Sequence, residues 1–262
     1  MAGAIFAIMN ATIAKICRYP VKGLSPEILE TITLTEGRAM PQDRRFALAP
    51  GTTAIDGPSV PWMQKGTFLT LVNKEKLAKL TTRFDDATGT LSIERVGKPV
   101  AKGNITTTIG RAMIEEFFAA YMGKDAKGRT KLVEAEPGIT LSDHQGAVVS
   151  FINLASVKDL ERVTGAAIDP IRFRGNILLQ GLDAWAEFDW IDQSINVGGA
   201  TLSVTNRIDR CGATNVDPDT GARDLNIPKD LQRGFGHIDM GVYGTVTTGG
   251  DIATGDRVSL TT

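Results

Sequence analysis

The sequence predicts a mainly β protein (α+β class) made of two packed β-barrel-like units with a few helices. Short runs in which polar and apolar residues alternate recur along the chain, and this is the period of half-buried strands. Many of the 28 glycines lie in turn contexts between these runs. Apolar residues at helical spacing are confined to a few segments. A length of 262 residues allows one large domain or two small ones.

Strand patterns occur from the N-terminal region to the C-terminal end. Lys15 and Arg18 fall inside the first of them, and an apolar run at 177–179 predicts another. Gly198 and Gly199 supply the tight connection of the clearest hairpin. The remaining runs are 31–35, a hairpin over 84–96 with its turn at 85–89, the hairpin over 195–204, and the tail segments 242–246 and 252–258.

Helical patterns are fewer. Apolar residues recur every three or four positions within 111–122, which predicts a helix with one buried face. A capping box that begins at Ser156 predicts the start of a second helix, which Gly165 ends. Asn73 is expected to cap a short helix over 74–81.

Composition excludes several classes of protein. Hydrophobic residues make up 42% and charged residues 23%, as in an ordinary globular protein, and the net charge of -1 favours neither a nucleic acid nor a membrane as partner. Two cysteines are too few for a disulfide framework or a four-cysteine iron–sulfur site and favour a reducing, cytoplasmic location. The first 14 residues lack side-chain charge, but we interpret them as a loose N-terminus rather than a targeting segment.

Cys211 is the first candidate for chemistry. It directly follows Arg210 and precedes the turn 217–221, and such an electropositive setting favours the thiolate that binds metals or attacks electrophiles. A free cysteine is also commonly a small buried hydrophobe, and spacing alone leaves both interpretations open. Cys17 lies within a strand pattern and is predicted to be structural.

Basic residues near predicted turns are the second candidate. Lys22 follows the first strand, Arg44 precedes another, and Arg174 precedes the apolar run at 177–179. Cations held at strand ends can grip a phosphate group. Taken singly, each is better explained as a solvated charge or as a surface ion pair that contributes little to stability.

Several short motifs, taken together and in order, resemble those of MOSC-domain proteins, the family named for the C-terminal domain of molybdenum cofactor sulfurases. The resemblance covers nearly the whole chain and implies a MOSC N-terminal β-barrel domain at 10–118 and a MOSC domain at 119–262. The motifs are Tyr19-Pro20-Val21-Lys22, Asp43-Arg44-Arg45-Phe46, Ser142-Asp143, Arg172-Phe173-Arg174-Gly175-Asn176, Arg210-Cys211, Asp217-Pro218-Asp219-Thr220-Gly221 and Gly255-Asp256. Separately, the polar, glycine-containing composition of residues 122–130 predicts a linker near the midpoint of the chain.

The resemblance implies a site for the molybdenum cofactor (Mo-molybdopterin). Cys211 stands at the position of the family's molybdenum-ligating, catalytic cysteine, and Asp143 is a candidate for orienting a ligand or moving a proton, or else a simple turn residue. The positions implied to bind the cofactor are Lys22, Arg44, Arg174, Asn176 and Arg210.

Four residues depart from the family pattern. Gly23 replaces a serine, Phe46 a tryptophan and Gly175 a proline, which is expected to free the loop around it. Asp209 stands where amidoxime-reducing relatives have Ser or Thr, and its charge would repel an anionic cofactor. Period-2 alternation puts Asp209 on the same face as Cys211, so either the strand breaks near Arg210 or Asp209 turns away into hydrogen bonds with backbone amides.

The sequence therefore predicts a molybdenum-dependent oxidoreductase that reduces N- or S-oxygenated small molecules. Its electrons would come from separate ferredoxin- or flavin-type proteins. The alternative is a carrier that holds sulfur as a Cys211 persulfide, received from a partner, or holds the intact cofactor. A third possibility is a pair of barrels that binds an unrelated anion. No pyridoxal phosphate site is expected in this chain.

Overall fold

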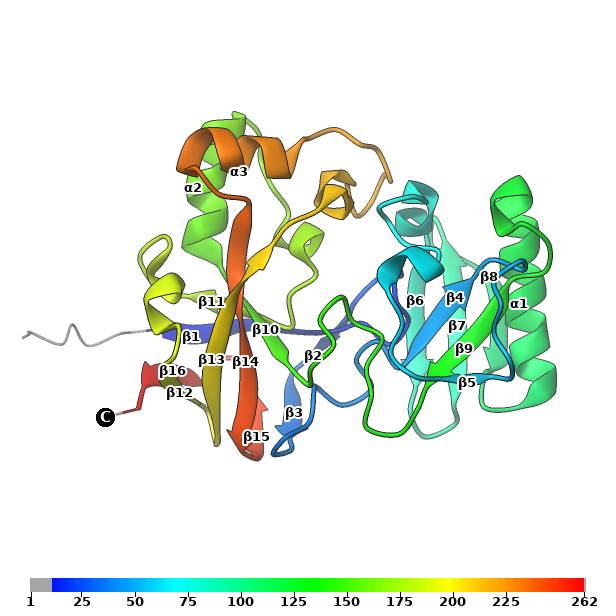
Figure 1. Ribbon diagram of the computed structural model, residues 1–262, viewed down its shortest axis with the longest axis horizontal. Helices are drawn as coiled ribbons and strands as arrows, with labels where there is room; N and C mark the ends of the chain where they lie inside the picture. Colours follow the sequence, from blue (N-terminus) through cyan, green and yellow to red (C-terminus); the bar gives the residue numbers. More distant parts are fainter. Residues whose placement is uncertain (1–10, 262) are drawn as a thin grey trace, which may run out of the picture.

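A closed barrel of seven strands forms the larger part of the computed structural model, which describes residues 11–261 (Figure 1). The barrel closes because β1 pairs with β11 as well as with β16. The neighbouring strands β10 and β11 run parallel, and all other neighbouring pairs of the barrel run antiparallel. In order of pairing its strands are β11 (Ile177–Gln180), β10 (Val149–Asn153), β14 (Asp239–Thr248), β13 (Ala200–Asp209), β12 (Ser194–Val197), β16 (Arg257–Leu260) and β1 (Ala11–Arg18).

The apolar residues of β1 explain why this strand forms part of the barrel wall. Ala11, Ile13 and Ile16 are fully buried in the same core as Phe151 and Trp190. The end of β1 also pairs with β2 (Glu27–Leu29), while β3 (Thr31–Leu34) pairs with β15 (Gly250–Ala253). Two helices, α2 (Leu154–Thr164) and α3 (Ile227–Phe235), pack together at one end of the barrel (Figure 1).

The second unit lies beside the barrel and is built from β4 to β9 (Figure 1). One sheet has the order β4-β9-β5 and the other is the meander β6-β7-β8, against which α1 packs. Phe46 and Phe84 meet edge to face in its core, with ring centroids 5.3 Å apart. The elements are β4 (Phe46–Ala49), β5 (Ser59–Val60), β6 (Thr81–Asp85), β7 (Thr90–Arg95), β8 (Lys98–Asn104), α1 (Thr108–Met122) and β9 (Lys131–Ala135).

The chain passes from the barrel to the second unit and back again. The boundary predicted between residues 118 and 119 falls inside α1, and β9, which follows it, pairs with β4 and β5. Conversely β1, at the start of the chain, pairs with barrel strands. The two units therefore consist of residues 46–135 and of the segments on either side. The division into domains at 10–118 and 119–262 stays a prediction, which these pairings qualify.

The predicted strands are confirmed, except that residues 254–256 lie between two strands, the last of which begins at Arg257, and one helix is confirmed with an earlier start. The helix predicted at 111–122 begins at Thr108, because the side chain of Thr107 caps it by accepting a hydrogen bond from the backbone N–H of Gly110 at 3.1 Å. Residues 122–130 do not form a free linker. Ala126 is buried, and Lys74 pairs with Asp125 at 2.8 Å, so the segment is packed as part of the second unit.

Two predicted helix caps were wrong. Asn153 caps α2, with its Oδ1 accepting from Ala155 N at 3.0 Å, while Ser156 lies inside the helix and its hydroxyl donates to the buried Glu187 carboxylate. Gly165 ends α2 as predicted, with φ of 72°. Asn73 caps no helix, because its side chain accepts a hydrogen bond from Thr70 N. In both cases a tertiary or turn contact competes with the cap that the local pattern predicts.

None of the helices within residues 11–261 is long and apolar enough to cross a membrane. The first 14 residues, which we interpreted as a loose N-terminus without a targeting function, lie mostly outside the described residues, which begin at Ala11.

Candidate functional site

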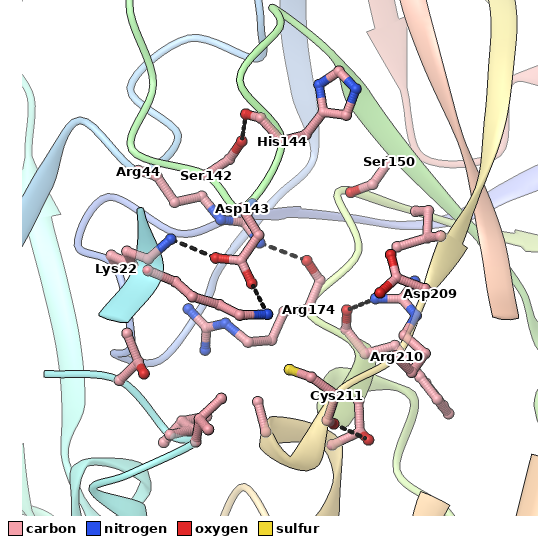
Figure 2. A pocket seen from close by; sticks show the side chains of 18 of the residues that line it. Lys22, Arg44, Ser142, Asp143, His144, Ser150, Arg174, Asp209, Arg210 and Cys211 are labelled. Carbon is pink, nitrogen blue, oxygen red and sulfur yellow. Dashed lines mark hydrogen bonds and ion pairs between the residues drawn. The ribbon is translucent and has the colours of Figure 1, made fainter. Parts of the chain in front are cut away.

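A cavity of about 330 Å³ lies between the barrel and the second unit, and all seven residues predicted for the site line it (Figure 2). This volume is within the range of small-molecule sites. Six cationic and three anionic residues contribute to its wall. The cations are Lys22, Arg44, Lys65, Arg172, Arg174 and Arg210, and the anions are Asp43, Asp143 and Asp209.

Segments distant in the sequence supply these side chains because each segment ends or begins at the junction of the two units. Lys22 follows β1, Arg44 precedes β4, and Arg174 ends the short 3-10 turn Pro170–Phe173. Arg44 and Arg174 both have positive φ, 48° and 53°. Non-glycine residues rarely adopt this left-handed conformation, and it is concentrated at functional sites.

Lys22, which is buried, and Asp143, which is half-exposed, form an ion pair on one wall of the cavity. The Lys22 Nζ donates to Asp143 Oδ1 at 2.6 Å and to the Leu141 carbonyl at 2.7 Å. Lys65, in the second unit, lies 3.5 Å from the other Asp143 oxygen. Burial opposes ionisation of Asp143, but Lys22 and then Lys65 outweigh it and lower the pKa of this carboxyl. Asp143 therefore stays ionised and is suited to orient a ligand or accept a proton.

Two arginines share one aromatic ring. The guanidinium carbons of Arg44 and Arg174 lie 4.4 and 4.3 Å from the centroid of the Tyr19 ring. Arg44 pairs with Asp43 and donates to the Arg174 carbonyl at 2.7 Å, which ties the two segments together. The ring holds both cations at the cavity wall by cation–π attraction.

Arg174 is the strongest sign that the cavity receives an anion. Its Nη1 donates to the Leu24 carbonyl at 2.8 Å, whereas its buried Nη2 has no hydrogen-bond partner among residues 11–261. Burial, together with the nearby Arg44, lowers the pKa of Arg174 to about 10. A buried guanidinium with an unused donor is costly unless a ligand supplies the acceptor.

Arg210 and Asn176 also line the cavity, but neighbouring groups already occupy most of their hydrogen-bonding atoms. The Arg210 guanidinium donates to the carbonyls of Met240 and Phe173. Asn176 is buried, and its Oδ1 accepts from the Ser150 backbone N–H and hydroxyl at 3.1 and 2.8 Å. Both residues hold the wall in place, and their predicted contact with a cofactor stays a prediction.

Two of the departures from the family pattern are explained by crowding. Gly23 has φ of 84°, and a Cβ at that position would lie 2.9 Å from the Leu69 carbonyl oxygen, so a serine has no room there. A Cβ at Gly175 would lie 2.3 Å from the Ile152 side chain. The loop is not freer for having glycine at 175, because Asn176 N donates to the Ser150 carbonyl at 3.0 Å.

Cys211 lies beyond the end of β13 and begins the 3-10 turn Gly212–Asn215, with its side chain at the cavity (Figure 2). Thr214 anchors this turn, because its backbone N–H and its hydroxyl both donate to the Cys211 carbonyl, at 3.1 and 2.9 Å. Among residues 11–261 no group of three or more His, Cys, Asp or Glu could hold a metal ion.

The break predicted near Arg210 is confirmed. The strand β13 ends at Asp209, and its pairing with β14 is irregular between Arg207 and Asp209. As a result Asp209, Arg210 and Cys211 all line the cavity. Asp209 does not turn away into backbone hydrogen bonds, since no described residue donates to its exposed carboxylate.

Replacing Asp209 with threonine is therefore expected to raise cofactor occupancy when the cofactor is limiting. Unit charges about 4 Å apart interact by about 1 kcal/mol in water, so we expect a gain of at most about fivefold. Molybdenum content by metal analysis is the measurement. Asp189→Thr, which removes an exposed carboxylate outside the cavity, is the control. Equal molybdenum content in wild type and Asp209→Thr would show that the carboxylate is neutral toward the cofactor.

Cys17 is confirmed as a core residue. It is fully buried, its backbone N–H donates to the Asn176 carbonyl at 2.7 Å, and burial raises the pKa of its thiol to about 12. We expect a thiol reagent at pH 8 to label Cys211 alone in the folded protein and both thiols after unfolding. Cys17→Ser should leave metal content unchanged and cost about 1–2 kcal/mol in chemical denaturation, because it buries a hydroxyl. Native labelling of two thiols would contradict this.

Lys65, Tyr243 and His144 are among the cavity residues that sequence reasoning missed. Lys65 begins the short 3-10 turn Lys65–Thr67, which has no recognisable motif, and Tyr243 lies in β14, where alternation predicts only a strand. The ring of His144 packs against that of Tyr243 in a tilted arrangement, with ring centroids 5.0 Å apart. The only available signal was that His144 directly follows the Ser142-Asp143 motif.

Comparison with known proteins identifies relatives of part of the chain. A model of the MOSC domain matches residues 139–259. Mitochondrial amidoxime-reducing component 1 of Homo sapiens is 29% identical over 122 residues, which are 42% of this chain and 36% of that protein. Mitochondrial amidoxime reducing component 2 of Homo sapiens is 29% identical over 116 residues, 40% of this chain and 34% of that protein. The chain thus spans about a third of the length of these curated relatives.

Solved structures are similar at lower identity. The YuaD protein from Bacillus subtilis aligns over 95% of this chain and 94% of its own, with a TM-score of 0.44 and 12% identity. YiiM from Geobacillus stearothermophilus aligns over 44% of this chain and 54% of its own, with a TM-score of 0.34 and 22% identity.

Proposed function

We propose that the protein binds the molybdenum cofactor and reduces N- or S-oxygenated small molecules at a molybdenum centre ligated by Cys211, because a model of the MOSC domain matches residues 139–259. The observation that carries the proposal is the convergence of Cys211 with Lys22, Arg44 and Arg174 on one cavity. A soft thiolate suits molybdenum, and the cations suit the phosphate of the pterin.

The residues present fit such a group. The unpartnered Nη2 of Arg174 offers a donor to a phosphate oxygen, and Arg44 lies beside it on the same tyrosine ring. Lys22 lines the same cavity, where Asp143 already partly neutralises it. When bound, the cofactor would supply the redox-active metal. The protein would supply one metal ligand and the charges that hold the phosphate.

The remaining polar residues would act on the substrate. Reduction of an N–OH or S=O group consumes two electrons and two protons and releases water, so the site must deliver protons. Asp143 is ionised and half-exposed, so it would orient the substrate or pass on a proton taken from solvent. Separate donor proteins would supply the electrons, because two cysteines cannot hold an iron–sulfur cluster of the four-cysteine type.

A carrier role is the second candidate, and the surroundings of Cys211 favour it. The thiol is partly exposed and shares the cavity with Lys65. Such a thiol could accept the outer sulfur of a donor persulfide, which releases the donor's thiol, and could pass that sulfur on to an acceptor in the same way.

Metal analysis, pterin fluorescence and turnover test the proposal on protein made in a cofactor-producing host. We expect stoichiometric molybdenum and pterin, together with reduction of an N-hydroxy compound when a chemical or protein donor is supplied. Cofactor without turnover would support the carrier, and so would a Cys211 persulfide detected by mass spectrometry. Protein free of both molybdenum and persulfide would contradict both candidates and leave an unrelated anion as ligand.

A further inference from the structure

The turn Asp217–Gly221 belongs to none of the walls described so far, although its sequence is one of the recognised motifs. Asp217 Oδ1 shapes the turn by accepting from the backbone N–H and the hydroxyl of Thr220, both at 2.7 Å. Gly221 has φ of 68°, and a Cβ there would lie 3.0 Å from the Glu75 carbonyl oxygen. Glycine therefore lets the turn lie directly against the second unit.

Arg223, just after this turn, joins the Cys211 segment to the opposite wall of the cavity. Its Nη1 donates to the Gly212 carbonyl at 3.0 Å. Its Nη2 donates to the carbonyls of Leu71 and Val72 at 2.9 and 2.7 Å. Gly212 directly follows Cys211 in the barrel, whereas Leu71 and Val72 line the cavity from the second unit. One guanidinium thus spans the junction of the two units next to the thiol.

Arg172 fixes the other end of the same short segment. Its side chain is 2% exposed and donates to both carboxylate oxygens of Asp224, at 2.9 and 2.8 Å, and to Asp217 Oδ2 at 3.0 Å. It also reaches the carbonyl of Asn215, the last residue of the 3-10 turn after Cys211, at 3.3 Å. Because Arg172 is two residues from Arg174, it links the cysteine segment to the anion-binding wall.

We propose that Arg223 is a positioning residue, which together with Arg172 clamps the turn Gly212–Asn215 and so fixes the depth at which the Cys211 thiol lies in the cavity. Guanidinium groups suit this task, since their planar fork of donors can satisfy several carbonyls in a fixed geometry, which an ammonium group cannot do. The inference rests on the proposed function only in taking Cys211 as the working thiol. Its test needs no cofactor.

The depth of the thiol sets the charges that it faces. Cys211 shares the cavity with six cations and three carboxylates, so the excess of positive charge attracts an anionic reagent to the thiol in its native position. The ratio of the alkylation rates with iodoacetate and with iodoacetamide measures this attraction. The intrinsic reactivity of the thiol cancels in the ratio, and buried Cys17 does not contribute in the folded protein.

The experiment compares this ratio in cofactor-free wild type, Arg223→Met and Arg223→Lys at pH 8 and low salt. We expect Arg223→Met to lower the ratio about threefold, the size expected when a unit charge in water moves out of reach of another. Arg223→Lys keeps the charge but loses the fork, so it should recover the ratio only in part. Arg162→Met, which removes an exposed arginine paired with Asp159 within α2, is the control and should match wild type.

Two results would overturn the proposal. The first is that folded Arg223→Met has the same ratio of alkylation rates as wild type. The second is that Arg223→Lys has the wild-type ratio, which would show that only the charge of residue 223 matters. If Arg223→Met does not fold, the lysine variant decides alone. Failure of this test leaves molybdenum binding untouched, because molybdenum is measured separately on loaded protein. Conversely, absence of molybdenum from loaded wild type would leave the alkylation result standing.

Discussion

Cys211→Ser is expected to abolish molybdenum retention while the fold stays intact. A neutral hydroxyl is a far poorer ligand than a thiolate for a soft metal. Substitution of residues that merely orient a metal ligand already costs about 10- to 100-fold in affinity, so removal of the ligand itself should cost at least as much. The turn should survive, because Thr214 holds it through the Cys211 backbone carbonyl rather than through the thiol.

Molybdenum per protein, measured by metal analysis after identical loading, is the readout, with thermal unfolding as the check on the fold. Cys17→Ser is the matched control, since it removes the other thiol of the chain from the buried core. Full molybdenum content in Cys211→Ser would mean that Cys211 is not the ligand. Pterin retained without molybdenum would separate the metal ligand from the phosphate contacts.

Arg174→Met should lower cofactor occupancy by about 10- to 100-fold, because charge-assisted hydrogen bonds contribute about 1.5–3 kcal/mol each. The cofactor-free variant should be nearly as stable as wild type. Burial lowers the pKa of Arg174 to about 10, so below that pH the folded protein carries a cation that is worse solvated than in the unfolded chain. Removing the cation relieves this cost and offsets the lost bond to the Leu24 carbonyl.

An anion that binds Arg174 should also stabilise the cofactor-free wild type. Inorganic phosphate should raise the melting temperature of cofactor-free wild type and have a smaller effect on Arg174→Met, since the unpartnered Nη2 is then gone. Arg257→Met, an exposed position on β16 outside the cavity, is the control. Wild-type pterin and molybdenum content in Arg174→Met would exclude Arg174 as a phosphate ligand.

Much of the local structure could be read from the sequence because it depends on neighbours along the chain. The hairpin at β12 and β13 follows from Gly198 and Gly199, and α1 follows from the apolar spacing within 111–122. The cap at Ser156 was mispredicted because the role of this residue depends on a partner that is distant along the chain. Its hydroxyl is used by Glu187, 31 residues away, and no local pattern reports such a partner.

The site residues could be named from short motifs, but their roles differ in ways that the motifs do not show. Arg174 keeps a free donor, whereas Arg210 has its guanidinium turned to the carbonyls of Met240 and Phe173. Lys65 went unnoticed because its partner, Asp143, comes from a distant loop. Whether a cation is free or already paired depends on contacts between segments far apart in the chain.

The sequence by itself determined the mainly β class, the local turns and the identity of the residues that could bind a metal and a phosphate. Alternation, glycine placement and motif order are properties of neighbouring residues, so they survive without a structure. Only the tertiary structure decided that β1 closes the barrel with β11, that residues 46–135 form the second unit, and that the cavity lies at their junction. Strand pairs and ion pairs form between residues that are close in space, and their separation along the chain does not show which residues are close.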